Sequence, residues 1–273
     1  MTRFDFSLKL KKMYVESGCD FFSFALLKSV LFEKNEIRGN MDPEEKVAQK
    51  MLSDAQKLIS GYPIQYYLGV WEFYERDFLC REGVLIPRPC TETVVKEAQK
   101  NLESGDYFCD FCCGSGCIGI TLLKNVPDTF CDFYDVSETA LSLTRDNAER
   151  HLCAERSRVQ YGNVLERIEI QKKPKLIVCN PPYIKTDDIL KLDKNVQNEP
   201  HLALDGGEDG LLFYKTLLTI YKQYIENGGI FVFELGDGEF EEFEKLCKDK
   251  GFSVVFANDE NGLVRCATVR IQK

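Results

Sequence analysis

The sequence lacks the signals that would assign it to a membrane or to an export route. None of its apolar runs approaches the roughly 18 residues that a membrane-spanning helix needs. The N-terminal segment has neither an uninterrupted apolar core nor a small-residue cleavage site, so no signal peptide is predicted. Internal repeats and low-complexity segments are missing as well. We therefore expect a globular protein that resides in the cytoplasm and has no membrane partner.

An excess of basic charge is also missing. The 273 residues include 35 lysines and arginines but 44 aspartates and glutamates, which gives a formal net charge of −9. Proteins that bind duplex nucleic acid usually present a basic face, because contacts to phosphate supply most of the affinity. The acidic balance favours a protein or a small molecule as the partner, with no direct contact to nucleic acid. The chain is further expected to be monomeric.

Twelve cysteines are present, but the ligand spacing of a metal site is not. Cys109 and Cys112 form a CxxC, and Cys113 and Cys117 lie close to them in the sequence. No second CxxC follows, and both histidines lie far along the chain. We predict no metal site. The cluster is interpreted as reduced, small apolar side chains at a crowded strand-to-helix turn.

The N-terminal part, residues 4 to 60, is predicted to be helical. Apolar residues recur at helical spacing between Val47 and Leu58, after the helix-start signature Asp-Pro-Glu-Glu at 42–45. Residues 21 to 32 are also apolar on one side. Gly-Tyr-Pro at 61–63 then interrupts the pattern. We assign residues 1–65 to a small helical domain.

The remainder of the chain changes character twice. From Tyr66 to Ile86 it is aromatic and β-branched, which predicts short strands or a hairpin, and residues 66–88 are assigned to a linker. In residues 89–273 strands and helices alternate, which predicts a doubly wound α/β sheet, with 252–256 and 264–271 as an antiparallel pair. The other predicted strands are 107–111, 129–134, 175–179 and 230–235, and the predicted helices are 91–102, 117–124, 138–151 and 209–226.

A glycine-containing loop follows the predicted strand at 107–111. Ligands of doubly wound sheets bind at such turns, where glycine lets the backbone approach a ligand closely. A P-loop is excluded, because no Gly-Lys-Ser/Thr follows. The loop, which we expect to bind a cofactor, consists of Cys112, Cys113, Gly114, Ser115 and Gly116.

An acidic residue, Asp135, ends the next predicted strand. It lies about 20 residues beyond the glycines, the spacing at which a carboxylate reaches ribose hydroxyls. A helix N-cap would also explain an aspartate, but not its register with the glycine loop. Gly114, Gly116 and Gly119 formally spell GxGxxG, so a dinucleotide and S-adenosylmethionine both remain open at this point.

The tetrapeptide Asn180-Pro181-Pro182-Tyr183 follows the strand predicted at 175–179. An amide or exocyclic amine nitrogen is a poor nucleophile, because its lone pair is delocalised. The Asn180 side-chain oxygen and the Pro181 carbonyl can accept its two hydrogens and aim it at a methyl sulfonium. The prolines hold the backbone rigid, and Tyr183 offers a flat face to a planar acceptor. Hydride transfer to a dinucleotide needs no such arrangement, so the motif favours S-adenosylmethionine.

Further segments extend the pattern from about residue 60 to the end. They are GYPIQY at 61–66, LG at 68–69, EF at 72–73, LIPRP at 85–89, EP at 199–200, ALDGG at 203–207 and DGL at 209–211. With NPPYI, they resemble the release-factor glutamine methyltransferases, which modify the glutamine of the Gly-Gly-Gln motif in peptide-chain release factors. The LIPRP and EP…ALDGG segments are more specific than NPPY, which many nitrogen methyltransferases share.

The resemblance implies a fold, a cofactor and a substrate. The fold is that of a class I S-adenosylmethionine methyltransferase, a Rossmann-like doubly wound sheet with an antiparallel edge, plus a small N-terminal helical domain. Residues 112–116 and Asp135 would hold S-adenosylmethionine, and Asn163 and Val164 would line its adenine side. Residues 180–183 would hold the acceptor glutamine, with Asn180 also beside the cofactor. The N-terminal helices match the family's substrate-docking domain in position and length, which implies release factors as partners.

Three positions depart from the family pattern. Cys112 stands where the family has glycine, and Asn163 and Cys90 stand where it usually has an acid. A side chain at Cys112 is expected to crowd the cofactor's carboxypropyl arm. Arg88 either anchors a loop over the cofactor or pairs with a surface acid, and Glu199 either orders the substrate loop or is a solvated turn residue.

Other functions remain as alternatives. The first is a glutamine methyltransferase that acts on a ribosomal protein. The second is an amino methyltransferase of a nucleic-acid base, which would need a basic groove for a flipped base and is disfavoured by the net charge. A cofactor-binding scaffold without activity would predict loss of Asn180 or the prolines, and all are intact.

Overall fold

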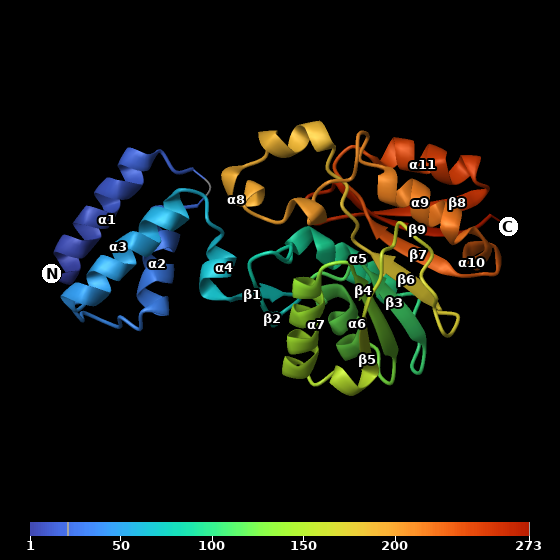
Figure 1. Ribbon diagram of the computed structural model, residues 1–273, viewed down its shortest axis with the longest axis horizontal. Helices are drawn as coiled ribbons and strands as arrows, with labels where there is room; N and C mark the ends of the chain where they lie inside the picture. The colour runs from blue at the N-terminus through green and yellow to red at the C-terminus, as the bar shows by residue number, and fades with distance from the viewer. Residues whose placement is uncertain (21, 273) are drawn as a thin grey trace.

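The N-terminal part of the molecule is a helical unit that lies beside a larger α/β unit, with the two chain termini at opposite ends of the molecule (Figure 1). The computed structural model describes residues 1–20 and 22–272. Three helices form the N-terminal unit: α1 (Arg3–Ser17), α2 (Phe24–Lys34) and α3 (Glu45–Ile59). The prediction that residues 4 to 60 are helical is confirmed, with breaks between the helices. Residue 21, where the second predicted apolar stretch begins, lies outside the described residues.

Capping and burial explain these helices. Thr2 and Ser23 are the N-caps of α1 and α2. The Thr2 side chain accepts a hydrogen bond from the Asp5 NH, and the Ser23 side chain accepts one from the Leu26 NH, both at 3.1 Å. Gly18, with a positive φ of 65°, ends α1. The helices share a core of their own, whose buried side chains include Phe6, Leu10, Leu27, Val30, Leu31, Met51, Ala55 and Leu58.

A short helix and a hairpin join this unit to the rest. α4 (Ile64–Leu68) precedes an antiparallel pair of β1 (Val70–Phe73) and β2 (Arg76–Leu79). The predicted hairpin is confirmed, but the prediction that strand structure begins at Tyr66 is wrong. Pro63 initiates a helical turn and Gly69, at φ 78°, ends it, so Tyr66 is helical.

Seven strands form the main sheet in the order β5-β4-β3-β6-β7-β9-β8. The first five of these are parallel, and β9 is antiparallel to both β7 and β8, as predicted for the last pair. The strands are β3 (Tyr107–Phe111), β4 (Phe130–Asp135), β5 (Ser157–Tyr161), β6 (Leu176–Cys179), β7 (Ile230–Glu234), β8 (Phe252–Asn258) and β9 (Val264–Ile271).

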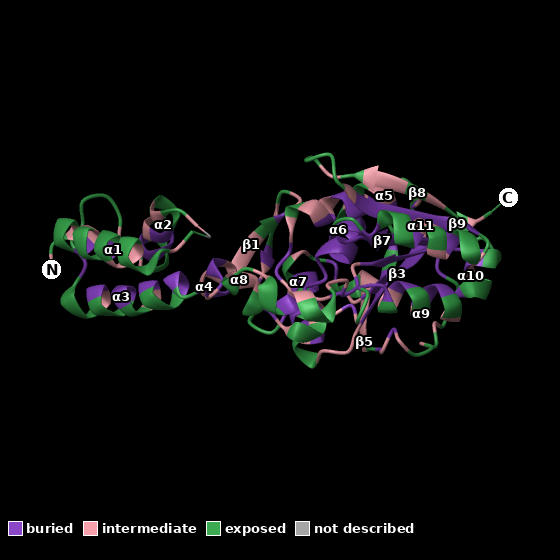
Figure 2. Cartoon of the chain, turned by 90° about the horizontal axis from the view of Figure 1, so that it is seen from above, coloured by how far each residue is buried: buried purple, intermediate pink, exposed green. Residues whose placement is uncertain are grey.

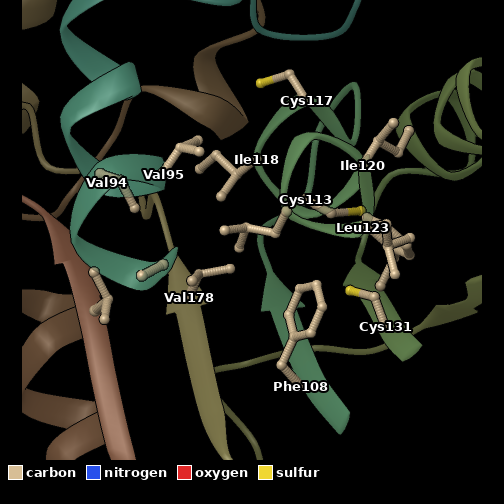
Figure 3. Close-up of a cluster of buried hydrophobic side chains, with 14 of the residues drawn as sticks. Val94, Val95, Phe108, Cys113, Cys117, Ile118, Ile120, Leu123, Cys131 and Val178 are labelled. Atoms are coloured by element: carbon tan, nitrogen blue, oxygen red, sulfur yellow. The ribbon is translucent and has the colours of Figure 1, made fainter. Parts of the chain in front are cut away.

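Helices cover both faces of this sheet, which confirms the doubly wound α/β class. Successive residues of β3 alternate between the faces: Phe108 packs with α5 (Glu92–Gln99), α6 (Cys117–Asn125) and α7 (Glu138–Arg150). Cys109 packs with α9 (Leu212–Ile220), α10 (Lys222–Glu226) and α11 (Phe240–Asp249). The buried residues accordingly concentrate between the helical layers (Figure 2), and Figure 3 shows the first of the two clusters.

Among the longer elements, β5 and α11 were not predicted from the sequence, and α9 and α10 were predicted as one helix. β5 contains one aliphatic residue, Val159, lies at the edge of the sheet and is only partly buried, so its apolar pattern is weak. α11 was not predicted either. The helix predicted at 209–226 is divided at Tyr221 into α9 and α10. Within the described residues, no helix has the length and apolar character to cross a bilayer.

The remaining elements are short. They are the 3-10 helices at Pro89–Thr91, Ala154–Arg156, Thr186–Lys191 and His201–Ala203, and the four-residue α8 (Lys194–Gln197).

Candidate active site

Two adjoining cavities lie where the parallel strands end. The larger has a volume of about 400 Å³ and the smaller about 170 Å³. Four residues line both: Leu85, Arg88, Asn180 and Ala203. Pockets for ligands of drug size span roughly 300–1,000 Å³. The larger cavity is therefore of the size that a nucleoside ligand needs, and the smaller one suits a single side chain.

The glycine loop, residues 112–116, forms one wall of the larger cavity. Cys112, Gly114 and Gly116 all have positive φ values, of 56°, 55° and 76°. Cys112, Cys113, Gly114 and Ser115 line the cavity, whereas Gly116 does not. A Cβ at Gly116 would lie 2.9 Å from Thr144 Cγ2, so this glycine shapes the turn into α6 instead of facing the ligand.

Cys112 departs from glycine at some conformational cost. A left-handed backbone is disfavoured for residues that carry a Cβ, by roughly 1–2 kcal/mol. Its side chain packs with the cluster on the α9 face, and contact with the Cys179 thiol together with burial raises the pKa of the Cys112 thiol. The packing explains how a small side chain is accommodated in this left-handed conformation.

Polar side chains from β4 and α7 hold the glycine loop in place. Asp135 Oδ2 accepts a hydrogen bond from the Gly114 NH at 3.0 Å, and its Oδ1 accepts one from the Ser137 NH at 2.9 Å. Thr144 Oγ1 donates to the Gly114 carbonyl at 2.9 Å, and Asn147 Nδ2 donates to the Ser115 carbonyl at 2.9 Å. Thr144 and Asn147 were not predicted to belong to the site. Their buried polar side chains within an apolar helix face were the available signal.

Asp135 lines the larger cavity at the end of β4. Ser137 is the N-cap of α7, because its side chain accepts from the Ala140 NH at 3.3 Å, so capping does not account for Asp135. Burial raises the pKa of its carboxyl, and the backbone donors oppose that shift. A largely desolvated carboxylate beside a cavity is suited to bind hydroxyl groups.

The third glycine of the formal GxGxxG, Gly119, has a packing role. A Cβ there would overlap the Phe133 ring, so only glycine lets α6 approach β4. Its NH donates to the buried Asp110 Oδ2 at 2.9 Å, and burial raises the pKa of Asp110 to about 8.

Asn163 and Val164 follow β5 and line the larger cavity. The Asn163 side chain accepts a hydrogen bond from the Leu165 NH at 3.1 Å and donates one to Glu166 at 2.9 Å. An acid at this position would accept from Leu165 equally well. Asparagine therefore keeps the turn that an acid would make and adds a bond to Glu166.

The NPPY loop, residues 180–183, lies between the two cavities. Asn180 lines both, Pro182 lines the larger, and Pro181 and Tyr183 line the smaller. Tyr183 donates through its hydroxyl to Glu234 Oε1 at 3.1 Å. Among the described residues, the Asn180 side chain has no hydrogen-bond partner, which leaves its amide oxygen available to a ligand.

Three glycines form a backing for this loop that the sequence analysis did not explain. A Cβ at Gly206 would lie 2.6 Å from Tyr183 Cα, and one at Gly210 would lie 2.5 Å from the Tyr183 carbonyl oxygen. One at Gly236 would lie 3.0 Å from Tyr183 Cδ2. Glu239 closes the backing: its Oε2 accepts from the Gly236 NH at 3.0 Å, and burial raises its pKa to about 7.

Two buried acids, Glu199 and Glu234, lie beside the cavities. Glu199 is not a solvated turn residue: it is 4% exposed, pairs with Arg88 and accepts a hydrogen bond from the Ile86 NH at 3.0 Å. Glu234 is fully buried and lines the smaller cavity, and burial raises the pKa of its carboxyl.

The cysteine cluster does not converge on a point. Cys109 packs on the α9 face of the sheet, while Cys113 and Cys117 pack on the α6 face, as Figure 3 shows for the latter two. Among the described residues, no group of three histidine, cysteine or acidic side chains is placed to hold a metal ion.

Comparison with known families and folds identifies the class. Residues 89–209 match the Methyltransferase small domain family. The catalytic domain of hMettl16, solved with the MAT2A 3′UTR hairpin 6, has a TM-score of 0.58 at 12% identity, over 93% of this chain and 94% of that one. A methyltransferase from Pyrococcus furiosus has a TM-score of 0.52 at 17% identity, over 72% and 88% of the two chains. These structures share the fold. The family match, together with this shared fold, indicates a methyltransferase domain.

Sequence relatives narrow the class to a family. The Release factor glutamine methyltransferase of Clostridium acetobutylicum is 33% identical over 254 residues, which cover 88% of this chain and 85% of the relative. That of Geobacter sulfurreducens is 37% identical over 233 residues, covering 85% and 80%. The chain belongs to the release factor glutamine methyltransferase family.

Proposed function

We propose that this chain transfers a methyl group from S-adenosylmethionine to the side-chain amide nitrogen of the glutamine in the Gly-Gly-Gln motif of release factors. The observation that carries the proposal is the position of Asn180, which lines both the larger and the smaller cavity. A group at that junction can contact an acceptor and a donor at the same time. The alternatives are a glutamine of a ribosomal protein and the amino group of a nucleic-acid base.

The larger cavity fits the cofactor. Its volume of about 400 Å³ is sufficient, and Gly114 leaves open space, because the atom nearest to a Cβ there is Val84 Cγ1 at 3.8 Å. Asp135 would bind the ribose hydroxyls, the backbone of residues 112–115 would pass beside the amino-acid arm, and Asn163 and Val164 would line the adenine side. When bound, S-adenosylmethionine supplies an electrophilic methyl group on a sulfonium.

The smaller cavity would take the acceptor side chain. The Asn180 amide oxygen and the Pro181 carbonyl would accept the two amide hydrogens, which orients the nitrogen lone pair without a strong base. Tyr183 is fixed by its bond to Glu234 and by the glycine backing, so its ring is a rigid wall. Fixed acceptors lose little entropy on binding, which is the main gain that such a site provides.

The rest of the chain is assigned around this site. Residues 1–65 would be a docking domain for the release factor, residues 66–88 a linker, and residues 89–273 the catalytic domain. Docking at a distance holds the target glutamine in place and raises turnover as well as affinity. The acidic composition favours a protein substrate over direct contact with nucleic acid, and we further propose that the chain acts as a monomer in the cytoplasm.

Mass spectrometry tests the substrate directly. The chain is incubated with S-adenosylmethionine that carries a labelled methyl group and with a purified release factor, and the label is located in peptides. We expect a single methyl group on the Gly-Gly-Gln glutamine and none on a release factor in which that glutamine is replaced by asparagine. Label on ribosomal protein or on nucleic acid, with an unmodified release factor, would replace the proposal by the corresponding alternative.

A short peptide acceptor tests the docking assignment. A Gly-Gly-Gln peptide presents the same side chain but must lose the flexibility of its glycines on binding. The intact release factor should be methylated with a much higher kcat/KM than the peptide. Equal values for the two acceptors would mean that residues 1–65 do not dock the substrate.

A further inference from the structure

Residues 83–88, here called the strap, cross both cavities without belonging to a helix or a strand. All six line the larger cavity, and Leu85 and Arg88 line the smaller one as well. The strap has few backbone hydrogen bonds: the Val84 NH donates to the Arg81 carbonyl at 3.2 Å, and the Arg88 carbonyl accepts from the Thr91 NH at 3.1 Å. Its position must therefore depend on side chains from elsewhere.

Two side chains hold the strap, one from each side. The buried Tyr66 of α4 donates through its hydroxyl to the Val84 carbonyl at 2.7 Å. Glu199 accepts from the Ile86 NH at 3.0 Å through Oε2 and binds the Arg88 guanidinium through Oε1. Both carboxylate oxygens of Glu199 are thus engaged with the strap, across more than 110 residues of sequence.

The segment that carries Glu199 also belongs to the site. Pro200 and Leu202 line the larger cavity, Leu204 lines the smaller, and Ala203 lines both. On its other side, Asn198 Nδ2 donates to the Gly61 carbonyl at 3.1 Å, just after α3. Glu199 consequently joins two cavity walls that no backbone ladder joins, at the point where the N-terminal unit meets them.

From this arrangement we infer that Glu199 is a positioning residue for methyl transfer: through Ile86 and Arg88 it fixes the wall that the cofactor cavity and the acceptor cavity share. The inference rests on the proposed function in one respect, the assignment of the smaller cavity to the acceptor. Glu199 itself lines neither cavity. It acts through the strap, so its loss shifts the relative placement of two ligands more than the affinity for either.

The chain offers a matched control for this role. Asp132 of β4 is likewise a buried carboxylate paired with an arginine, Arg158, and it lines neither cavity. Removal of one partner from a buried ion pair destabilises a protein in either case. Only the Glu199 pair should affect the geometry of transfer.

The experiment compares Glu199→Gln with Asp132→Asn in the full-length chain. Glutamine is isosteric and can still accept from the Ile86 NH, but it removes the charge that binds Arg88. With release factor and cofactor both saturating, Glu199→Gln should lower kcat about tenfold or more, since small misplacement of reactants is costly. The KM values should change less than kcat. Asp132→Asn should lower the melting temperature and leave kcat close to that of the wild type.

Several results would overturn the inference while leaving the proposed function intact. If the wild type methylates release factor and both variants lose stability but keep kcat, Glu199 is only structural. Equal losses of kcat in both variants lead to the same conclusion. If Glu199→Gln fails to fold, Glu199→Asp, which keeps the charge but cannot reach both partners, replaces it with the same expected loss of kcat. A wild type inactive on release factor would instead refute the proposed function.

Discussion

The two loops that form the site are held in different ways. The glycine loop (residues 112–116) is held by side chains, the Asp135 carboxylate and the polar groups of Thr144 and Asn147. The NPPY loop (residues 180–183) is bonded through the Tyr183 hydroxyl to Glu234, but behind it Gly206 and Gly210 pack directly against the Tyr183 backbone. Side-chain contacts adjust to a changed neighbour, while a backbone packed against a backbone does not. This difference explains how the glycine loop accommodates the Cys112 side chain, while the space behind the NPPY loop is filled by main chain and admits only glycine.

The largest expected effect separates the loops by function. Asn180→Ala removes the proposed acceptor of an amide hydrogen, which should lower kcat by about 100-fold or more while cofactor affinity stays nearly unchanged. Asp135→Ala on the other loop should do the reverse and weaken cofactor binding by about tenfold, because a hydrogen bond to a charged group contributes roughly 1.5 kcal/mol. Steady-state kinetics on release factor and titration calorimetry with S-adenosylmethionine measure the two quantities. Turnover by Asn180→Ala near the wild-type rate would remove Asn180 from the chemistry.

The next effect tests the difference in how the loops are held. A Cβ at Gly206 would lie 2.6 Å from Tyr183 Cα and 2.7 Å from its carbonyl carbon, so Gly206→Ala should lower the free energy of unfolding by about 3 kcal/mol. Gly114→Ala places a Cβ in open space and only imposes a positive φ, which costs about 1 kcal/mol. Urea denaturation of the two variants gives both values. Equal losses would mean that the NPPY loop yields as readily as the glycine loop.

The smallest effect concerns pH and the backing of the NPPY loop. Burial raises the pKa of Glu239 from 4.5 to about 7, so the folded state binds this proton more tightly than the unfolded state. The resulting stability is fully present below the unfolded pKa and is lost as the pH rises through about 7. Glu239→Gln should therefore flatten the fall of the melting temperature between pH 5 and pH 7.5, by less than about 4 °C.

The exposed Glu241 provides the control for this prediction, since it lies two residues further along, in the first turn of α11, and carries the same charge. Glu241→Gln should leave the pH profile of the melting temperature unchanged. Identical profiles for the wild type and Glu239→Gln would show that Glu239 does not titrate in this range.

Much of the framework was predictable because local patterns specify it. β6 is a continuous apolar run, and β3 is apolar apart from Asp110. Each is followed directly by its functional loop, so the meeting of the two loops at one sheet edge follows from the parallel topology. β5 could not be found in this way, because an edge strand needs little apolar surface. The break at Tyr221 leaves both helices apolar on the same face, and sequence periodicity does not reveal it.

The rest of the site depends on contacts between distant residues. Glu199 resembles a turn residue in its own sequence context, and only the approach of Ile86 and Arg88 makes it a buried partner. The same applies to Gly206 and Gly210. Their motif was visible, but the reason for it is the Tyr183 backbone more than 20 residues earlier in the chain. A sequence pattern shows that a glycine is present, but it does not show which neighbouring atoms would clash with a side chain at that position.

The glycine backing has a consequence for how such enzymes diversify. At Gly206 the space for a side chain is filled by the main chain of Tyr183, whatever molecule enters the smaller cavity. Selection for a new acceptor can therefore act on the cavity walls, such as Leu204 or Val196, but not on this position. Gly206 is required by the shape of the loop and not by its substrate. Members of the family that have changed their acceptor should therefore still have glycine at this position.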